Sequence, residues 1–136
     1  MKENILFGTD GWRGIIAKDF TFSGVESCAE GVAKYHIAQN LHNQPLVIGY
    51  DTRFASKEFA EHAANTIARN NIKVLLCENA TPTPVVSNAI VEFKASGGII
   101  ITASHNPYNW NGFKYRTSYG GSPDNNEIAT IENFIN

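Results

Sequence analysis

Residues 97–118 read GGIIITASHNPYNWNGFKYRTS. The β-branched run at 99–102 is typical of a buried central strand. Residues 113–117 alternate between apolar and polar side chains, which indicates a half-exposed strand. The polar loop at 103–112 leaves no room for a helix between these two strands. We therefore expect the second strand to lie antiparallel, at an edge of the sheet.

The rest of the chain alternates apolar strand patterns with helical ones. Strands are expected at 5–8, 46–50, 72–77, 99–102 and 113–117, and helices at 23–41, 56–70, 84–93 and from 122 onward. We expect Ser56 and Thr83 to cap the starts of their helices, Ser122 to start the last helix, and glycines 8, 11 and 14 to form a loop. This order predicts an α/β fold, a three-layer α/β/α domain with a mixed, mostly parallel sheet of about four strands.

Composition narrows the functional class. The chain has 136 residues, about one domain, with 43% hydrophobic and 18% charged residues and a net charge of -2. That charge does not favour nucleic acid or an anionic membrane as a partner. No apolar run is long enough to span a membrane. The N-terminus lacks a secretory pattern, and Cys28 and Cys77 have no metal or redox spacing. We expect a cytoplasmic protein with reduced thiols.

Three polar segments follow predicted strands, at 10–14, 51–53 and 103–114. Ligands of open α/β sheets bind outside the carboxyl ends of the strands, so these segments indicate a site at one edge. The alternative is that their Gly, Asn and Asp residues serve only as turn formers.

Ser104 stands at a sharp corner after the central strand. The nucleophile elbow of a serine hydrolase requires glycine two residues before and two residues after the serine. Residues 102 and 106 are not glycines, which disfavours a serine hydrolase. A corner serine can instead carry a phosphoryl group, which needs cations around it. Arg13, His105 and Lys114 are the candidates, together with a divalent metal ion. Each also has an ordinary interpretation: a loop salt bridge for Arg13, a polar loop residue for His105 and a solvated strand face for Lys114.

Four segments carry a family resemblance. Residues 98–114, GIIITASHNPYNWNGFK, resemble the active-site serine loop of the α-D-phosphohexomutases, the superfamily of phosphoglucomutase and phosphomannomutase. FGTDGWRG at 7–14, GYDTR at 49–53 and TPTP at 81–84 resemble three further motifs of that family, in the same order. The resemblance covers nearly the whole chain.

The resemblance implies a role for each candidate residue. Ser104 would be phosphorylated, Arg13 and Lys114 would lie against the phosphoserine and assist proton transfer, and His105 would help to hold the phosphoryl group. One phosphoserine oxygen would bind Mg²⁺ together with three Asp of a later domain. Hexose 1-phosphate and 6-phosphate, of glucose or mannose, would interconvert through a bisphosphate, with a glucose 1,6-bisphosphate-type activator.

The family enzymes have four domains, and residues 1–136 resemble domain I alone. The resemblance therefore implies the remaining domains as partners and no mutase turnover by this chain by itself. The alternative is a stand-alone phosphosugar-binding module, in which the same cations form a static anion site without covalent chemistry.

Overall fold

The computed structural model describes residues 4–8 and 11–136. Its elements are β1 (Trp12–Ile15), α1 (Phe22–Ala38), β2 (Leu46–Tyr50), α2 (Ser56–Arg69), β3 (Val74–Leu76), α3 (Thr83–Glu92), β4 (Gly97–Ile101), β5 (Trp110–Thr117) and α4 (Asn125–Ile135).

The strands form one mixed sheet in the order β1-β5-β4-β2-β3. Strand β2 runs parallel to β3 and β4, whereas β5 runs antiparallel to β4 and β1. The α/β class and the antiparallel β5 are therefore confirmed. The expected edge position of β5 is wrong, because β1 pairs with its outer side and makes a fifth strand.

The N-terminal strand lies later in the chain than expected. Gly8 and Gly11 exchange two backbone hydrogen bonds, of 2.9 and 3.0 Å, so the chain turns where the glycines cluster and β1 follows the turn. The expected strand at 5–8 is wrong. The amides of Ile5 and Phe7 donate to the side chains of Asn136 and Glu132 instead of joining a ladder. The apolar pattern there reflected burial against α4 and not sheet pairing.

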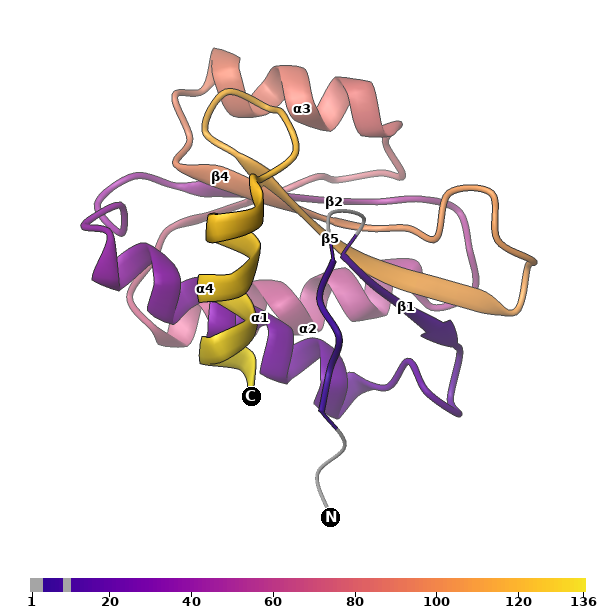
Figure 1. The fold of residues 1–136 in the computed structure, drawn as a ribbon. Helices are drawn as coiled ribbons and strands as arrows, with labels where there is room; N and C mark the ends of the chain where they lie inside the picture. Colours follow the sequence, from indigo (N-terminus) through magenta and orange to yellow (C-terminus); the bar gives the residue numbers. More distant parts are fainter. Residues whose placement is uncertain (1–3, 9–10) are drawn as a thin grey trace.

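Helices cover both faces of the sheet, as the three-layer architecture requires (Figure 1). Helices α1, α2 and α4 lie on one face, and α3 lies on the other. Successive residues of β4 serve the two cores: Ile99 and Ile101 belong to the larger core, and Ile100 packs with Val86 and Ile90 of α3. Burying one such side chain contributes roughly 1.5–3 kcal/mol.

Three expected helix starts differ in detail. Ser56 is the first residue of α2 and does not cap it. The residue that caps α4 is Asp124, whose side chain accepts from the amide of Glu127, and Ser122 lies outside the helix. Helix α3 already includes Thr83. The N-cap residues of α2 and α3 are Ala55 and Pro82, and neither makes a side-chain capping bond, so residue type alone did not locate these helix starts.

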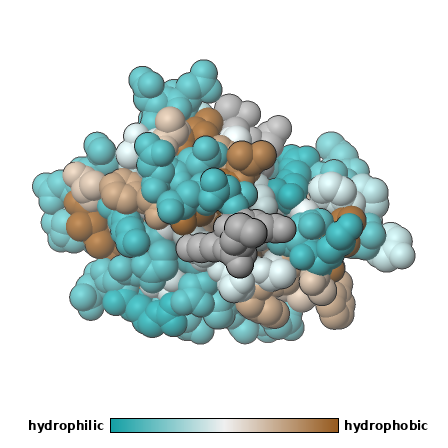
Figure 2. Space-filling view, turned by 60° about the horizontal axis from the view of Figure 1, so that its bottom comes forward, coloured by the Kyte–Doolittle hydropathy of each residue, from teal (hydrophilic) through white to brown (hydrophobic). Residues whose placement is uncertain are grey.

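The surface on the side of α1, α2 and α4 is mainly hydrophilic, with separate apolar patches (Figure 2). In the described part of the chain, no helix combines the length and the apolarity that crossing a membrane requires. Cys28 and Cys77 are both unpaired thiols, and burial raises the pKa of Cys28 well above its usual range.

Candidate active site

Ser104 lies in a tight turn directly after β4. The amide of Asn106 donates to the carbonyl of Ala103 at 3.0 Å, and the amide of Ser104 donates to Oγ1 of Thr102 at 3.1 Å. Ser104 has φ of 55°, in the left-handed region. For a residue other than glycine this conformation costs about 1–3 kcal/mol, and such residues cluster at functional sites. The turn leaves Ser104 exposed at the carboxyl end of a buried strand.

Lys114 on β5 reaches back to this turn and donates a hydrogen bond from Nζ to Oγ of Ser104. The register pairs Lys114 with Ile100, so its side chain lies on the face of the sheet that α3 covers. Lys114 is only 6% exposed. The interpretation of Lys114 as part of a solvated strand face is therefore wrong, because its side chain is buried and its Nζ is bonded to the serine turn.

Arg13 lies on β1 and not in the expected loop. It stands opposite Gly112, so Arg13 and Lys114 share one face of the sheet. Nη1 of Arg13 donates to Oδ1 of Asn106 at 2.8 Å. Its Nε is buried, and no group in residues 4–8 and 11–136 accepts a hydrogen bond from it. Arg13 therefore contacts the serine turn through Asn106 and makes no salt bridge within the described residues. Asp10, which began the expected polar segment, lies outside the described residues.

His105 follows Ser104 in the turn and is exposed. No hydrogen bond or ion pair joins its imidazole to the part of the chain that the structure describes. Of the four predicted residues, Ser104 and Lys114 are therefore in direct contact, Arg13 is connected to them through Asn106, and His105 shares only the turn.

Arg53 is a functional candidate that sequence reasoning left without a role. It follows β2, whose carboxyl end lies beside that of β4 in the parallel pair. Its two terminal nitrogens donate to three carbonyl oxygens of the loop between β4 and β5 and to that of Trp110, the first residue of β5. The polar segment 51–53 pointed to this edge of the sheet, but residue types alone did not show that Arg53 contacts backbone.

A hollow of about 580 Å³ opens beside the serine turn. Its lining comprises Asp51, Thr52, Arg53, Phe54, Ser104, Asn106 and Tyr108. Sites for small molecules commonly have volumes of roughly 300–1,000 Å³. Phe54 and Tyr108 are 78% and 89% exposed, so the hollow has aromatic side chains on its rim.

The described residues do not supply a metal site by themselves. They contain no group of three or more His, Cys, Asp or Glu side chains placed to hold a metal ion. Asp51, the carboxylate in the hollow, is already engaged by Arg53 and Ser56.

Residues 4–136 match the family described as phosphoglucomutase/phosphomannomutase, alpha/beta/alpha domain I. A phosphoglucomutase of Staphylococcus saprophyticus is 36% identical, in an alignment that covers 98% of this chain and 25% of that protein. A phosphoglucomutase of Staphylococcus aureus is 39% identical, over 95% of this chain and 24% of its own length.

Solved structures agree in fold. A Thermus thermophilus protein assigned as a phosphomannomutase superposes with a TM-score of 0.95 at 36% identity, covering all of this chain and 31% of that one. A phosphoglucomutase/phosphomannomutase family protein of Burkholderia thailandensis gives 0.84 at 23% identity, over 99% of this chain and 30% of that one, which supports the fold alone. The chain spans about a quarter of the length of the curated relatives it matches.

Proposed function

The chain belongs to the phosphoglucomutase/phosphomannomutase family, and from this premise we propose that it is the catalytic-serine domain of a phosphohexomutase. Ser104 carries a phosphoryl group that it exchanges with a hexose 1-phosphate or 6-phosphate, of glucose or mannose. The names of the relatives support this reaction class.

One observation carries the proposal: the hydrogen bond from Nζ of Lys114 to Oγ of Ser104. A serine that is exposed in a strained turn and bonded to a nearly buried ammonium group is suited to holding a dianion. The unsatisfied Nε of Arg13, on the same face of the sheet, supports an anion site further, because buried donors are nearly always paired.

Two transfers make up the proposed reaction. The bond between phosphorus and Oγ of Ser104 breaks as a hydroxyl of the sugar phosphate attacks phosphorus, and the proton of that hydroxyl passes to solvent water. Lys114 supplies a proton to Oγ as it leaves, which restores the serine hydroxyl. The sugar bisphosphate then presents its other phosphate. Oγ attacks that phosphorus and gives its proton to Lys114, the bond from phosphorus to the sugar oxygen breaks, and the sugar oxygen takes a proton from solvent water. Positioning and charge neutralisation account for most of the catalysis in phosphoryl transfer.

The proposal places further requirements outside this chain. An oxygen of the Ser104 phosphoryl group would contribute one ligand to Mg²⁺, and the remaining ligands would come from a later domain of a longer protein. Mg²⁺ would supply charge neutralisation at the phosphoryl oxygens. A glucose 1,6-bisphosphate-type molecule would phosphorylate a serine that has lost its phosphate. Because the later domains would also bind the sugar, we expect no mutase turnover by residues 1–136 alone.

Replacing the serine tests the proposal. In the full-length protein, Ser104→Ala should lower the interconversion of glucose 1-phosphate and 6-phosphate on the order of 10³-fold or more, because the variant lacks the hydroxyl that would carry the phosphoryl group. Ser118→Ala, an exposed serine after β5, is the matched control and should keep full activity. A Ser104→Ala protein with full turnover would refute the proposal. Sugar-phosphate binding without turnover in both proteins would favour a binding module.

A further inference from the structure

We propose that Arg53 is a positioning residue that fixes the turn carrying Ser104 and does not contact the phosphosugar. The geometric part stands independently, and the catalytic part rests on the proposed function of Ser104. No sequence motif assigned this role, because it depends on contacts between segments about fifty residues apart.

The guanidinium of Arg53 joins four points of one loop. Nη2 donates to the carbonyl oxygens of Ser104 at 2.9 Å and Asn106 at 2.8 Å. Nη1 donates to those of Pro107 at 2.6 Å and Trp110 at 3.1 Å. Between β4 and β5 the backbone forms no regular structure, so its carbonyl groups need other donors. One planar side chain donates to three of them, of Ser104, Asn106 and Pro107, and thereby helps to hold the loop in a single path.

All four terminal donors of the guanidinium are in use. A guanidinium has four N–H groups on its terminal nitrogens and one on Nε. The four terminal groups make the carbonyl bonds, and Nε lies 3.3 Å from Oδ2 of Asp51, which also balances the charge. Arg53 thus has no terminal N–H left for a phosphate, and its Nε is paired with Asp51. Arg13 differs, because its Nε has no acceptor among the described residues.

A series of hydrogen bonds through Asp51, Ser56 and Asn111 holds Arg53 in place. Oδ1 of Asp51 accepts from the amide of Arg53 at 3.0 Å and from Oγ of Ser56 at 2.7 Å. Oγ of Ser56 accepts in turn from Nδ2 of Asn111 at 2.9 Å. Ser56 and Asn111 are fully buried, and the Arg53 side chain is 13% exposed. These hydrogen bonds connect the start of α2 to β5 and fix the position of the guanidinium.

This arrangement explains how Ser104 keeps its left-handed backbone. A strained conformation persists only where its surroundings determine it fully. The carbonyl of Ser104 is one of the four acceptors, and its hydroxyl is bonded to Lys114. Arg53 fixes one side of the residue and Lys114 fixes the other. Loss of Arg53 should let the peptide after Ser104 rotate and move Oγ away from Lys114.

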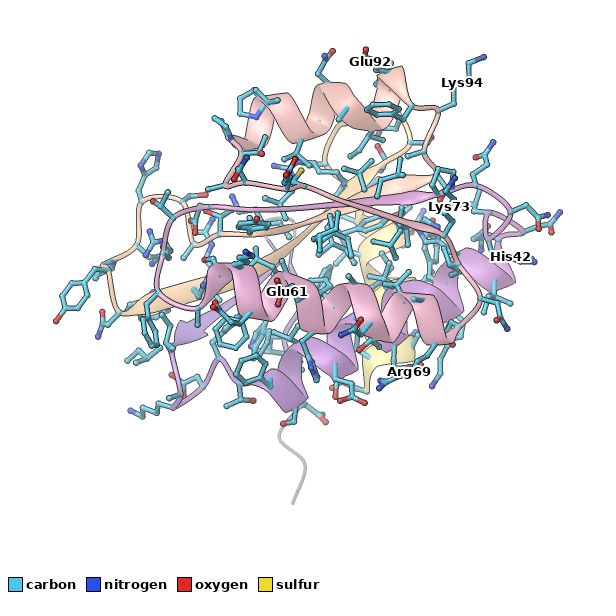
Figure 3. The ribbon with its side chains drawn as sticks, turned by 180° about the vertical axis from the view of Figure 1, so that it is seen from behind. His42, Glu61, Arg69, Lys73, Glu92 and Lys94 are labelled. Atoms are coloured by element: carbon cyan, nitrogen blue, oxygen red, sulfur yellow. The ribbon has the colours of Figure 1, made fainter. Side chains whose placement is uncertain are left out.

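The test uses Arg53→Lys in the full-length protein. Lysine keeps the charge but cannot donate to four separated carbonyls. We expect kcat to fall by about 10–100-fold, because small displacements of reacting groups cost this much, with KM for glucose 1-phosphate within about twofold. The matched control is Arg69→Lys, at the far end of α2, where an exposed arginine pairs with Glu26 (Figure 3). It should change neither constant.

A second readout reports on the loop itself. Hydrogen–deuterium exchange of peptides from 102–111 should become at least about tenfold faster in Arg53→Lys, because the turn is no longer held. Peptides from 97–101 in β4 serve as the internal reference for intact folding. If Arg53→Lys does not fold, Asp51→Asn, which removes only the carboxylate that orients the guanidinium, should give smaller changes of the same kind.

The outcomes distinguish the positioning role of Arg53 from the proposed function of Ser104. Normal kcat with normal loop exchange in Arg53→Lys would overturn the positioning role. A raised KM with unchanged kcat would also overturn it and make Arg53 a ligand for the sugar phosphate. If Ser104→Ala remains active, the proposed function fails, whereas faster loop exchange in Arg53→Lys would still support the structural role.

Discussion

Arg13 on β1 donates a hydrogen bond to Asn106 at 2.8 Å, although the two residues stand 93 positions apart in the chain. The bond attaches an N-terminal strand to the turn that carries Ser104. Pairing of β1 with β5 makes it possible, because β5 begins beside the carboxyl end of β4. Because β1 and β5 extend the sheet in antiparallel pairing, Arg13 and Lys114 both lie near the turn that carries Ser104.

Asn106 should matter through this bond. Asn106→Ala removes the acceptor of Arg13 and lets the guanidinium move, so we expect kcat in the full-length protein to fall by about 10-fold or more. Steady-state kinetics with glucose 1-phosphate measures the effect. Asn88→Ala, an exposed asparagine on α3, is the control and should be unaffected. Equal activity of both variants would show that Arg13 needs no such anchor.

Lys114 should contribute to the chemical step. Lys114→Gln keeps a hydrogen-bond donor near Ser104 but loses both the charge and the proton, so kcat should fall by roughly 10²–10⁴-fold. The control is Lys73→Gln, an exposed lysine before β3 (Figure 3). A Lys114→Gln variant within twofold of the wild type would contradict the proton-transfer role.

Gly11 should be needed for stability. It has φ of 77°, and a Cβ there would lie 1.9 Å from the carbonyl oxygen of Phe113. Gly11→Ala should lower the free energy of unfolding by more than about 1–2 kcal/mol, the cost of the left-handed conformation alone. Urea denaturation of the 136-residue chain measures it. Gly8→Ala is the matched control, because a Cβ at Gly8 would meet only ordinary van der Waals contact at 3.9 Å.

His36 should make stability depend on pH. Its imidazole is fully buried, with Nδ1 3.1 Å from Oγ of Ser96 and Nε2 2.7 Å from the hydroxyl of Tyr115. Burial lowers the pKa of His36 from 6.5 to about 4. Between those pH values the unfolded chain binds the proton and the folded chain does not. Stability is therefore lost as pH falls from 6.5 towards 4, by about 3 kcal/mol in total.

Urea denaturation at pH 7.5 and pH 4.5 measures this loss. His36→Gln should flatten the pH dependence, whatever its effect on stability at pH 7.5. His105→Gln replaces an exposed histidine whose side chain makes no hydrogen bond or ion pair within the described residues, and it should leave the dependence as in the wild type. An equally steep loss in His36→Gln would assign the acid sensitivity to other groups.

The sequence was sufficient for the architecture because burial and alternation are local signals. The run Ile99–Ile101 and the alternation that begins at Phe113 predicted β4 and β5 and their antiparallel relation. The place of a strand in the sheet order depends on contacts between segments that are distant in sequence. That β5 is internal depends on β1, whose start is set by the turn at Gly8 and Gly11, and apolar residues at 5 and 7 obscured that turn.

The candidate site, too, was predictable from the sequence only in part. Ser104, Lys114 and Arg13 were found because their side chains are chemically conspicuous, and the structure brings them to one edge of the sheet. Arg53 was missed in its role because its partners are carbonyl oxygens, which every residue has. No residue type in the loop marks which carbonyls lack a donor, so only the three-dimensional path of the loop reveals the contact.

The most direct test of the account is to measure phosphate on Ser104. The full-length protein is incubated with glucose 1,6-bisphosphate and digested, and the peptides that span residues 98–114 are analysed by mass spectrometry. We expect one phosphate, located on Ser104, which is lost when glucose 6-phosphate is added in excess. An unmodified Ser104 in a protein that interconverts glucose 1-phosphate and 6-phosphate would contradict the account.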